Sequence, residues 1–199
     1  MIQATNNTEI MQTEWHFSTP IYRIEKPEWV NKANKTSEKY ITESKKRAQS
    51  DLKKRKKLLG NKDYLKVKDH GMSYHSTPLN GDPGFKELES YIGNTGFNLL
   101  NEWGYDMKQY SVFFTEFWVQ EFAKNGGGHH DTHVHWDNHI SGFYFLKCSD
   151  KTSYPVMQDP RAGAMMTKLP QKDKSKAGPM SDQIFYQPKP GTLIFFPAY

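Results

Sequence analysis

The spacing of hydrophobic residues changes once along the chain, from a helical period to the pattern of strands. From residue 37 to 59, apolar or small residues recur at helical spacing and predict an amphipathic helix that ends at Gly60. Pro27 is placed to open this helical region, because proline is tolerated in the first turn of a helix. A second stripe of the same period predicts a helix over residues 85–103.

After Gly104, aromatic and β-branched residues replace the helical pattern and predict strands. Residues 70–84 and 168–182, which are rich in Pro, Gly, Ser or Lys, predict loops. We expect one domain over residues 1–199, helical from about 27 to 104 and β-rich from about 105 to 199. The predicted strands cover residues 19–24, 110–122, 140–148, 154–158, 184–187 and 192–196.

Composition limits the location and the class of the protein. The 199 residues include one cysteine, Cys148, which excludes an internal disulfide and fits a reducing compartment. No stretch reaches the roughly 18 apolar residues of a membrane span, and the first residues lack the pattern of a signal peptide. We therefore expect no membrane association and a cytoplasmic location, in the host cytoplasm if the chain is viral.

The net charge of +5 comes from one segment. Residues 45–57 hold eight Lys or Arg opposed only by Asp51, while the remainder is near neutral. Such a segment is either a solvated helix face or a contact surface for an acidic partner. The aromatic residues that interleave with lysine in single-stranded nucleic-acid grooves are missing from it.

The densest candidate chemistry lies in residues 126–139, Gly-Gly-Gly-His-His-Asp-Thr-His-Val-His-Trp-Asp-Asn-His, which hold five of the eight histidines. Alternate side chains of a strand point the same way, so an extended segment would direct all its odd-numbered histidines and aspartates to one side. This pattern predicts a first-row transition metal at the mouth of a β-barrel. The odd-numbered residues are His129, Asp131, His133, His135, Asp137 and His139.

Only one pair of these side chains can chelate a single ion, because residues 129–139 would span roughly 33 Å if extended. His129 with Asp131, and His135 with Asp137, both match the His-x-Asp half of a 2-His-1-carboxylate iron site. The pair His133 and His135 is the third alternative. This last pair also fits the start of a cupin pattern, although the glutamate expected a few residues later is missing.

Four blocks follow one another along the chain: Thr19-Pro20-Ile21-Tyr22, the segment from Trp118 through His133-x-His135 to Ser141–Leu146, Asp159-Pro160-Arg161, and Pro190–Pro197. Their order and spacing make the chain resemble a family of 2-oxoglutarate/Fe(II)-dependent oxygenases of marine bacteria and their phages, distant relatives of prolyl hydroxylases. The resemblance implies an α+β fold with a double-stranded β-helix (jelly-roll) core and N-terminal helices packed on one sheet. It also implies Fe(II) and 2-oxoglutarate as cofactors of a dioxygenase with an undetermined protein or small-molecule substrate.

The resemblance favours His133 and His135 as the metal-binding catalytic pair, with Asp137 as the second choice for a ligand. Ser141 would meet the cosubstrate, if strand alternation turns Ser141, Phe143 and Phe145 toward the site. Asp159 and Arg161 are expected to form a structural ion pair, and Trp118 is expected in the core.

Family members continue past the Phe-Pro block to a distal histidine ligand and a cosubstrate-binding arginine. In this sequence only Ala198 and Tyr199 follow that block, and neither can fill these roles. The pattern thus predicts an oxygenase that lacks its C-terminal strands and has weak or no turnover. The alternatives are a non-catalytic jelly-roll binding or structural module, viral in origin, with a vestigial metal site, or a cupin-type metalloprotein. A homo-oligomer is a further expectation.

Overall fold

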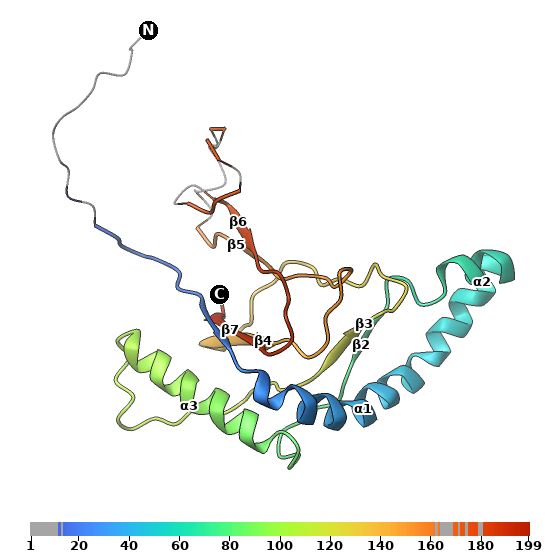
Figure 1. Cartoon of the computed structure of the whole chain (residues 1–199), viewed down its shortest axis with the longest axis horizontal. Helices are drawn as coiled ribbons and strands as arrows, with labels where there is room; N and C mark the ends of the chain where they lie inside the picture. Colours follow the sequence, from blue (N-terminus) through green and yellow to red (C-terminus); the bar gives the residue numbers. More distant parts are fainter. Residues whose placement is uncertain are drawn as a thin grey trace, which may run out of the picture.

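The computed structural model describes residues 12, 14–161, 163, 169–170, 172–173, 175–178 and 181–199. In these residues, three α-helices accompany three small antiparallel sheets (Figure 1). In chain order the elements are β1 (Tyr22–Glu25), the 3-10 helix η1 (Pro27–Trp29), α1 (Val30–Arg47), α2 (Gln49–Val67), β2 (Ser73–His75), α3 (Lys86–Glu102), β3 (Gln120–Phe122), β4 (Ile140–Tyr144), β5 (Val156–Gln158), β6 (Gln183–Phe185) and β7 (Thr192–Pro197).

The helical predictions are confirmed in type and corrected in extent. Pro27 opens η1, and α3 agrees with the prediction to within one residue at each end. The first predicted helix is longer than expected, because α1 begins at Val30 and α2 continues to Val67. Gly60 breaks the helical backbone with φ 74° and ψ 162°, as a glycine can, but the chain resumes its helix afterwards.

The strand predictions were right in place, and most were too long, although β7 runs one residue further than predicted. Residues 110–119 are irregular, and a regular strand begins only at Gln120. The predicted loop 70–84 contains β2, which pairs antiparallel with β3. Strand β2 has only three residues, too few to show the alternation of polar and apolar residues that identifies a strand in the sequence. The described residues of the predicted loop 168–182 lie outside any strand, and the other residues of that loop fall outside the described part of the chain.

The central sheet has the order β1-β7-β4, so the last strand of the chain lies between the first strand and β4. Tyr22 pairs with Phe195, and Gly142 pairs with the same residue from the other edge. The N-terminal and C-terminal halves of the chain therefore share a sheet. The described strands form three separate sheets, and the closed double-stranded β-helix stays a prediction.

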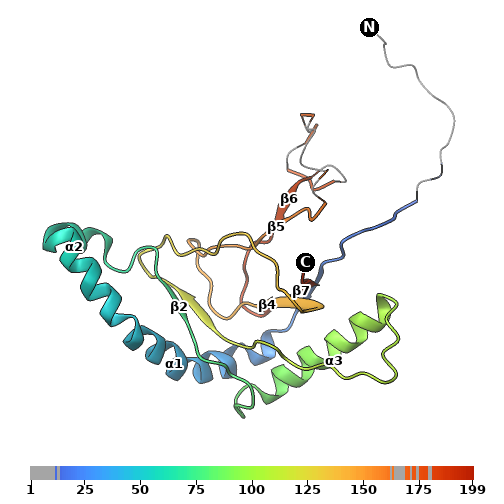
Figure 2. The ribbon, with the colours of Figure 1, turned by 180° about the vertical axis from the view of Figure 1, so that it is seen from behind.

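Helices α1 and α3 cover one face of the central sheet, while β5 and β6 lie on the side away from them (Figures 1 and 2). Leu99 of α3 packs on Leu193 and Phe195 of β7. A second cluster joins Ala33 of α1 to Leu88 of α3. Alternation along β7 turns residues 193 and 195 toward the helices and leaves residues 194 and 196 for the opposite face.

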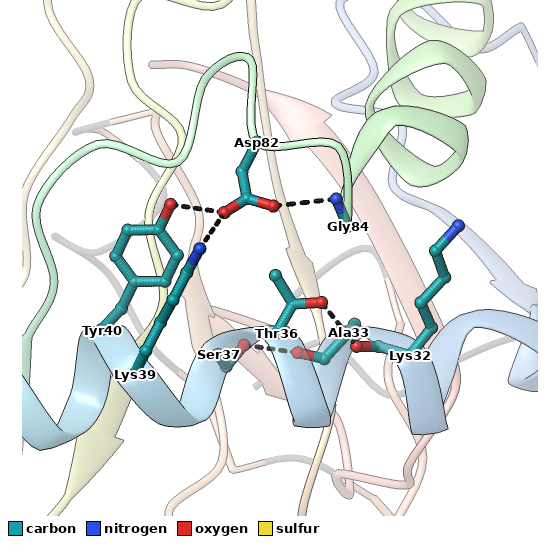
Figure 3. Close-up of polar contacts among 8 residues, drawn as sticks. All are labelled: Lys32, Ala33, Thr36, Ser37, Lys39, Tyr40, Asp82 and Gly84. Atoms are coloured by element: carbon teal, nitrogen blue, oxygen red, sulfur yellow. Dashed lines mark hydrogen bonds and ion pairs between the residues drawn. The ribbon is translucent and has the colours of Figure 1, made fainter.

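A carboxylate fixes the loop before α3 to α1 (Figure 3). Asp82 accepts hydrogen bonds from Lys39 Nζ at 2.6 Å, from the Tyr40 hydroxyl at 2.7 Å and from the Gly84 N–H at 2.8 Å. These donors, Lys39 foremost, lower the pKa of Asp82 to about 2. The loop passes so close to α1 that a side chain at Gly84 would meet Thr36. The arrangement stabilises the helical layer beneath the sheet.

The basic segment 45–57 lies at the end of α1 and in α2. Helix α2 has no buried residue and lies at the outer end of the molecule in both views (Figures 1 and 2). None of the helices in the described part of the chain is long and apolar enough to cross a membrane.

Candidate functional site

The histidine segment 129–139 is irregular, and this corrects the expectation that its odd-numbered side chains share one side. Bends and turns occupy it before β4 begins at Ile140. Asp137 itself has a positive φ of 59°, which takes the backbone out of the extended region. The path of the loop, and not strand alternation, therefore determines which of these side chains lie close together.

Two of the predicted ligands do come together. The rings of His133 and His135 lie 5.1 Å apart between centroids and are inclined by only 10°. His133 is exposed, and His135 is half-buried. A metal ion reaching this pair would meet one imidazole open to solvent and one already held by the fold.

His135 is held by both its backbone and its ring. Its N–H donates to the carbonyl of Ala198 at 2.7 Å, and the N–H of Ala198 donates to His139 at 3.1 Å. On the ring, Nδ1 lies 2.6 Å from the hydroxyl oxygen of Ser141 on β4. The end of β7 and the start of β4 thus fix this histidine from two directions.

The hydrogen bonds leave the outer nitrogens available for a metal. Nδ1 of His133 lies 2.6 Å from the carbonyl oxygen of Asp131, and a carbonyl only accepts, so Nδ1 carries the proton. The lone pair is then on Nε2, which can bind a metal while Nδ1 keeps its hydrogen bond. The same tautomer follows for His135 when Nδ1 donates to Ser141. Burial and the neighbouring His133 lower the pKa of His135 and favour its neutral, metal-binding form.

A third imidazole, His130, borders the pair and was missed in the sequence because it sits at an even position. Its ring centroid lies 5.9 Å from that of His133. Burial, followed by the charges of His133 and His75, lowers its pKa. The half-buried Trp118 stacks on His130 and lies 3.7 Å from the ring of His75. Only the approach of β2 to β3 brings His75 into this row, so local sequence gave no signal for it.

The other predicted ligands do not lie close enough together to bind one metal ion. His129 and Asp131 approach to 3.7 Å, but both side chains are largely exposed. Asp137 is exposed as well and remains a prediction as a ligand. Within the described part of the chain, no three His, Cys, Asp or Glu side chains are grouped closely enough to hold a metal ion. The roles of His133 and His135 as metal ligands therefore stay predictions, which their proximity supports.

An aromatic surface continues from the histidine pair across the sheet. Phe196 of β7 contacts His135 edge-on at 6.4 Å and Phe143 of β4 at 5.3 Å. Phe143 also contacts Phe145 at 6.3 Å. Ser141, Phe143 and Phe145 share one face of the strand, as strand alternation predicts, while Tyr144 packs on the opposite side with the helices. The site is thus bounded by a polar end and an apolar wall.

Asp159 and Arg161 form the predicted ion pair. Two hydrogen bonds of 2.9 and 2.6 Å join the guanidinium to the carboxylate, and Arg161 lowers the pKa of Asp159 to about 2. The two partners satisfy each other across one turn, and the structural role of the pair stays a prediction.

A pair of imidazoles whose Nε2 atoms have no hydrogen-bond partner among the described residues lies at the edge of a small antiparallel sheet and defines a candidate metal centre. Residues 116–199, which contain this centre, match the model of a family described as "Putative 2OG-Fe(II) oxygenase". The match supports an oxygenase-like enzyme that uses Fe(II) and 2-oxoglutarate. A search of curated proteins found no match to the chain.

Proposed function

We propose that the protein is an Fe(II)- and 2-oxoglutarate-dependent dioxygenase in which His133 and His135 hold the metal. The observation that carries the proposal is the adjacency of these two rings inside the segment that matches the oxygenase family. Asp137 is the second choice for a carboxylate ligand. Iron with bound 2-oxoglutarate would supply the oxidising chemistry of a hydroxylation.

The residues of the chain have separate tasks in this proposal. Ser141 orients His135 through the 2.6 Å contact, and we expect its hydroxyl to meet the cosubstrate as well. The Ala198 carbonyl fixes the backbone of His135. Phe143 and Phe196 give the site an apolar wall that limits the access of water. None of these tasks requires the side chain to react.

The test is metal analysis of the full chain together with anaerobic titration by Fe(II) and 2-oxoglutarate. We expect one bound iron and a visible absorption band that requires 2-oxoglutarate, and, once oxygen is admitted, release of succinate. His133→Ala and His135→Ala should abolish the band. His129→Ala is the matched control, because this neighbouring imidazole is largely exposed and its removal should leave the band intact.

Three results would overturn the proposal. Metal bound equally well without 2-oxoglutarate would indicate a cupin-type metalloprotein. Absence of metal binding by the folded protein would indicate a non-catalytic binding module. A band that survives loss of both His133 and His135 would assign the metal to other residues.

The role of Ser141 has its own test. Ser141→Ala removes the hydroxyl beside His135, and loss of such an orienting contact lowers metal affinity by about 10- to 100-fold. Ser50→Ala, at an exposed position of α2, is the control and should leave the affinity unchanged. Equal affinities of Ser141→Ala and the wild-type chain would show that the hydroxyl does not orient the ligand.

A further inference from the structure

Helix α2 and the end of α1 carry all of the excess positive charge of the protein. Residues 45–68 contain eleven Lys or Arg and two Asp, a net charge of +9, whereas the whole chain carries +5. The remaining residues therefore carry a net −4. A molecule with such separated charge presents its basic end to any polyanion that approaches it.

Part of this basic segment is already engaged with the protein. Lys45 pairs with Glu121, Arg47 pairs with Glu43 at 3.0 Å, and Arg55 donates to the carbonyl of His70 at 2.5 Å. Lys45 and Arg47 belong to α1, and the contact of Arg55 fixes the inner side of α2. Leu52, Tyr64 and Leu65 face the same side, where they line an open cavity of about 500 Å³.

Three lysines form an unengaged stripe on the outer side. Lys46, Lys53 and Lys57 are seven and four residues apart, and these separations place them on one face of a helix. The helical path continues through Ala48, whose N–H donates to Ser44 and whose carbonyl accepts from Leu52. All three lysines are exposed, and no ion pair joins them to another residue described in the structure.

The length of the stripe fits a nucleic-acid duplex. Eleven residues at 1.5 Å each separate Lys46 from Lys57, so the stripe extends about 16 Å. A duplex presents roughly ten phosphate charges over that length of its axis. Gln49 and Ser50 lie exposed between the lysines and add uncharged donors for phosphate oxygens.

Other polyanions fit the surface less well. A helix that lies on a membrane needs a continuous apolar face, but Leu58 and Leu59 point about 100° apart and Leu65 follows the break at Gly60. Lysine is depleted at protein–protein interfaces, which are built around apolar or aromatic anchors. Single-stranded nucleic acid needs exposed aromatic rings for stacking, and Tyr64, the aromatic residue of α2, is half-buried beside Lys56.

We propose that Lys46, Lys53 and Lys57 form a surface that binds the phosphate backbone of double-stranded nucleic acid without regard to sequence. The surface is independent of the proposed oxygenase chemistry, because none of its residues belongs to the candidate metal centre. It would hold the protein on a duplex by counterion release alone.

The experiment is fluorescence anisotropy of the full chain with a labelled DNA duplex of about two helical turns, repeated between about 50 and 200 mM salt. The affinity should fall linearly on a log–log plot against salt. The triple variant Lys46→Gln, Lys53→Gln, Lys57→Gln should lower the slope by about 2.7, because each phosphate contact contributes about 0.9. Its affinity at the lower salt should fall at least about tenfold.

The matched control replaces three exposed lysines outside the basic segment, Lys108, Lys147 and Lys151, by glutamine. It removes the same charge and should keep most of the slope and affinity. Circular dichroism checks that both variants retain their helices. The slope of the wild-type chain reports by itself the number of phosphate contacts, even if a variant does not fold. Equal losses in both variants, or a wild-type affinity that does not respond to salt, would overturn the proposal. Tighter binding to single-stranded DNA, phosphatidylserine vesicles or polyglutamate than to the duplex would also overturn it.

Discussion

Gly142 of β4 lies close to the backbone of β7, and replacing it by alanine tests the packing of the central sheet. A Cβ atom at this position would lie 2.5 Å from the carbonyl oxygen of Ile194. Real Cβ atoms essentially never approach another atom within 3.0 Å, so one strand must move by at least half an ångström. Ile194 has no exposed surface and lies in a strand paired on both edges, so the movement strains its neighbours.

The magnitude follows from two opposing effects. Overpacking a closely packed interior costs about 1–3 kcal/mol, while replacing glycine by alanine restricts the unfolded chain and returns about 0.4–1 kcal/mol. We expect Gly142→Ala to lower the free energy of unfolding by about 1–2 kcal/mol. For a chain of this size that corresponds to a fall in Tm of roughly 2–8 °C.

The assay is thermal and urea unfolding followed by circular dichroism, with Gly96→Ala as the matched control. A Cβ at Gly96 in α3 meets nothing within 4 Å, so this variant should gain up to about 1 kcal/mol in stability from helix propensity. Because Gly142 adjoins Ser141, the displaced strand should also weaken iron binding at His135. Unchanged stability of Gly142→Ala would refute the close approach of the two strands.

Three further outcomes are expected. Ile194→Ala should lower the free energy of unfolding by about 2–5 kcal/mol in urea titration, because it empties a fully buried position, and Ile194→Val should cost about 0.5–1.5 kcal/mol. Because its donors lower the pKa of Asp82 to about 2, the ionised carboxylate stabilises the fold above about pH 4, and this contribution is lost as the pH falls toward 2. Asp82→Asn should therefore make the free energy of unfolding less dependent on pH over that window. Tyr144→Phe removes the donor to the carbonyl of Lys26 and should cost about 1 kcal/mol, whereas Tyr110→Phe, at an exposed ring, should be neutral in the same measurement.

The sequence predicted only those contacts of the candidate site that join residues close together in the chain. The proximity of His133 and His135 follows from their separation by one residue, and the ion pair of Asp159 with Arg161 follows from the same short separation. The contact of Ser141 with His135 needed the turn between them, and the carbonyl of Ala198 reaches His135 from the far end of the chain. Sequence spacing contains no information on such long-range contacts.

The expectation that the odd-numbered histidines and aspartates of residues 129–139 share one side was wrong for a physical reason. Alternation predicts a shared side only for an extended chain, and the segment before β4 turns instead, with Asp137 at a positive φ. His130, at an even position, then lies beside His133 while Asp137 stays exposed. The identity of the neighbours of a histidine in a loop depends on where the loop is fixed, here by the strands on either side of it.

The sequence by itself determined the presence of the helices, the location of the basic helix and the segment that holds the histidine pair, because these depend on periods of a few residues. The tertiary structure alone decided that β7 lies between β1 and β4, that β2 pairs with β3, and that His130 and His75 extend the row of imidazoles. Those outcomes depend on which distant strands bury the same apolar surface. Burial is a property of the whole chain and cannot be read from any window of it.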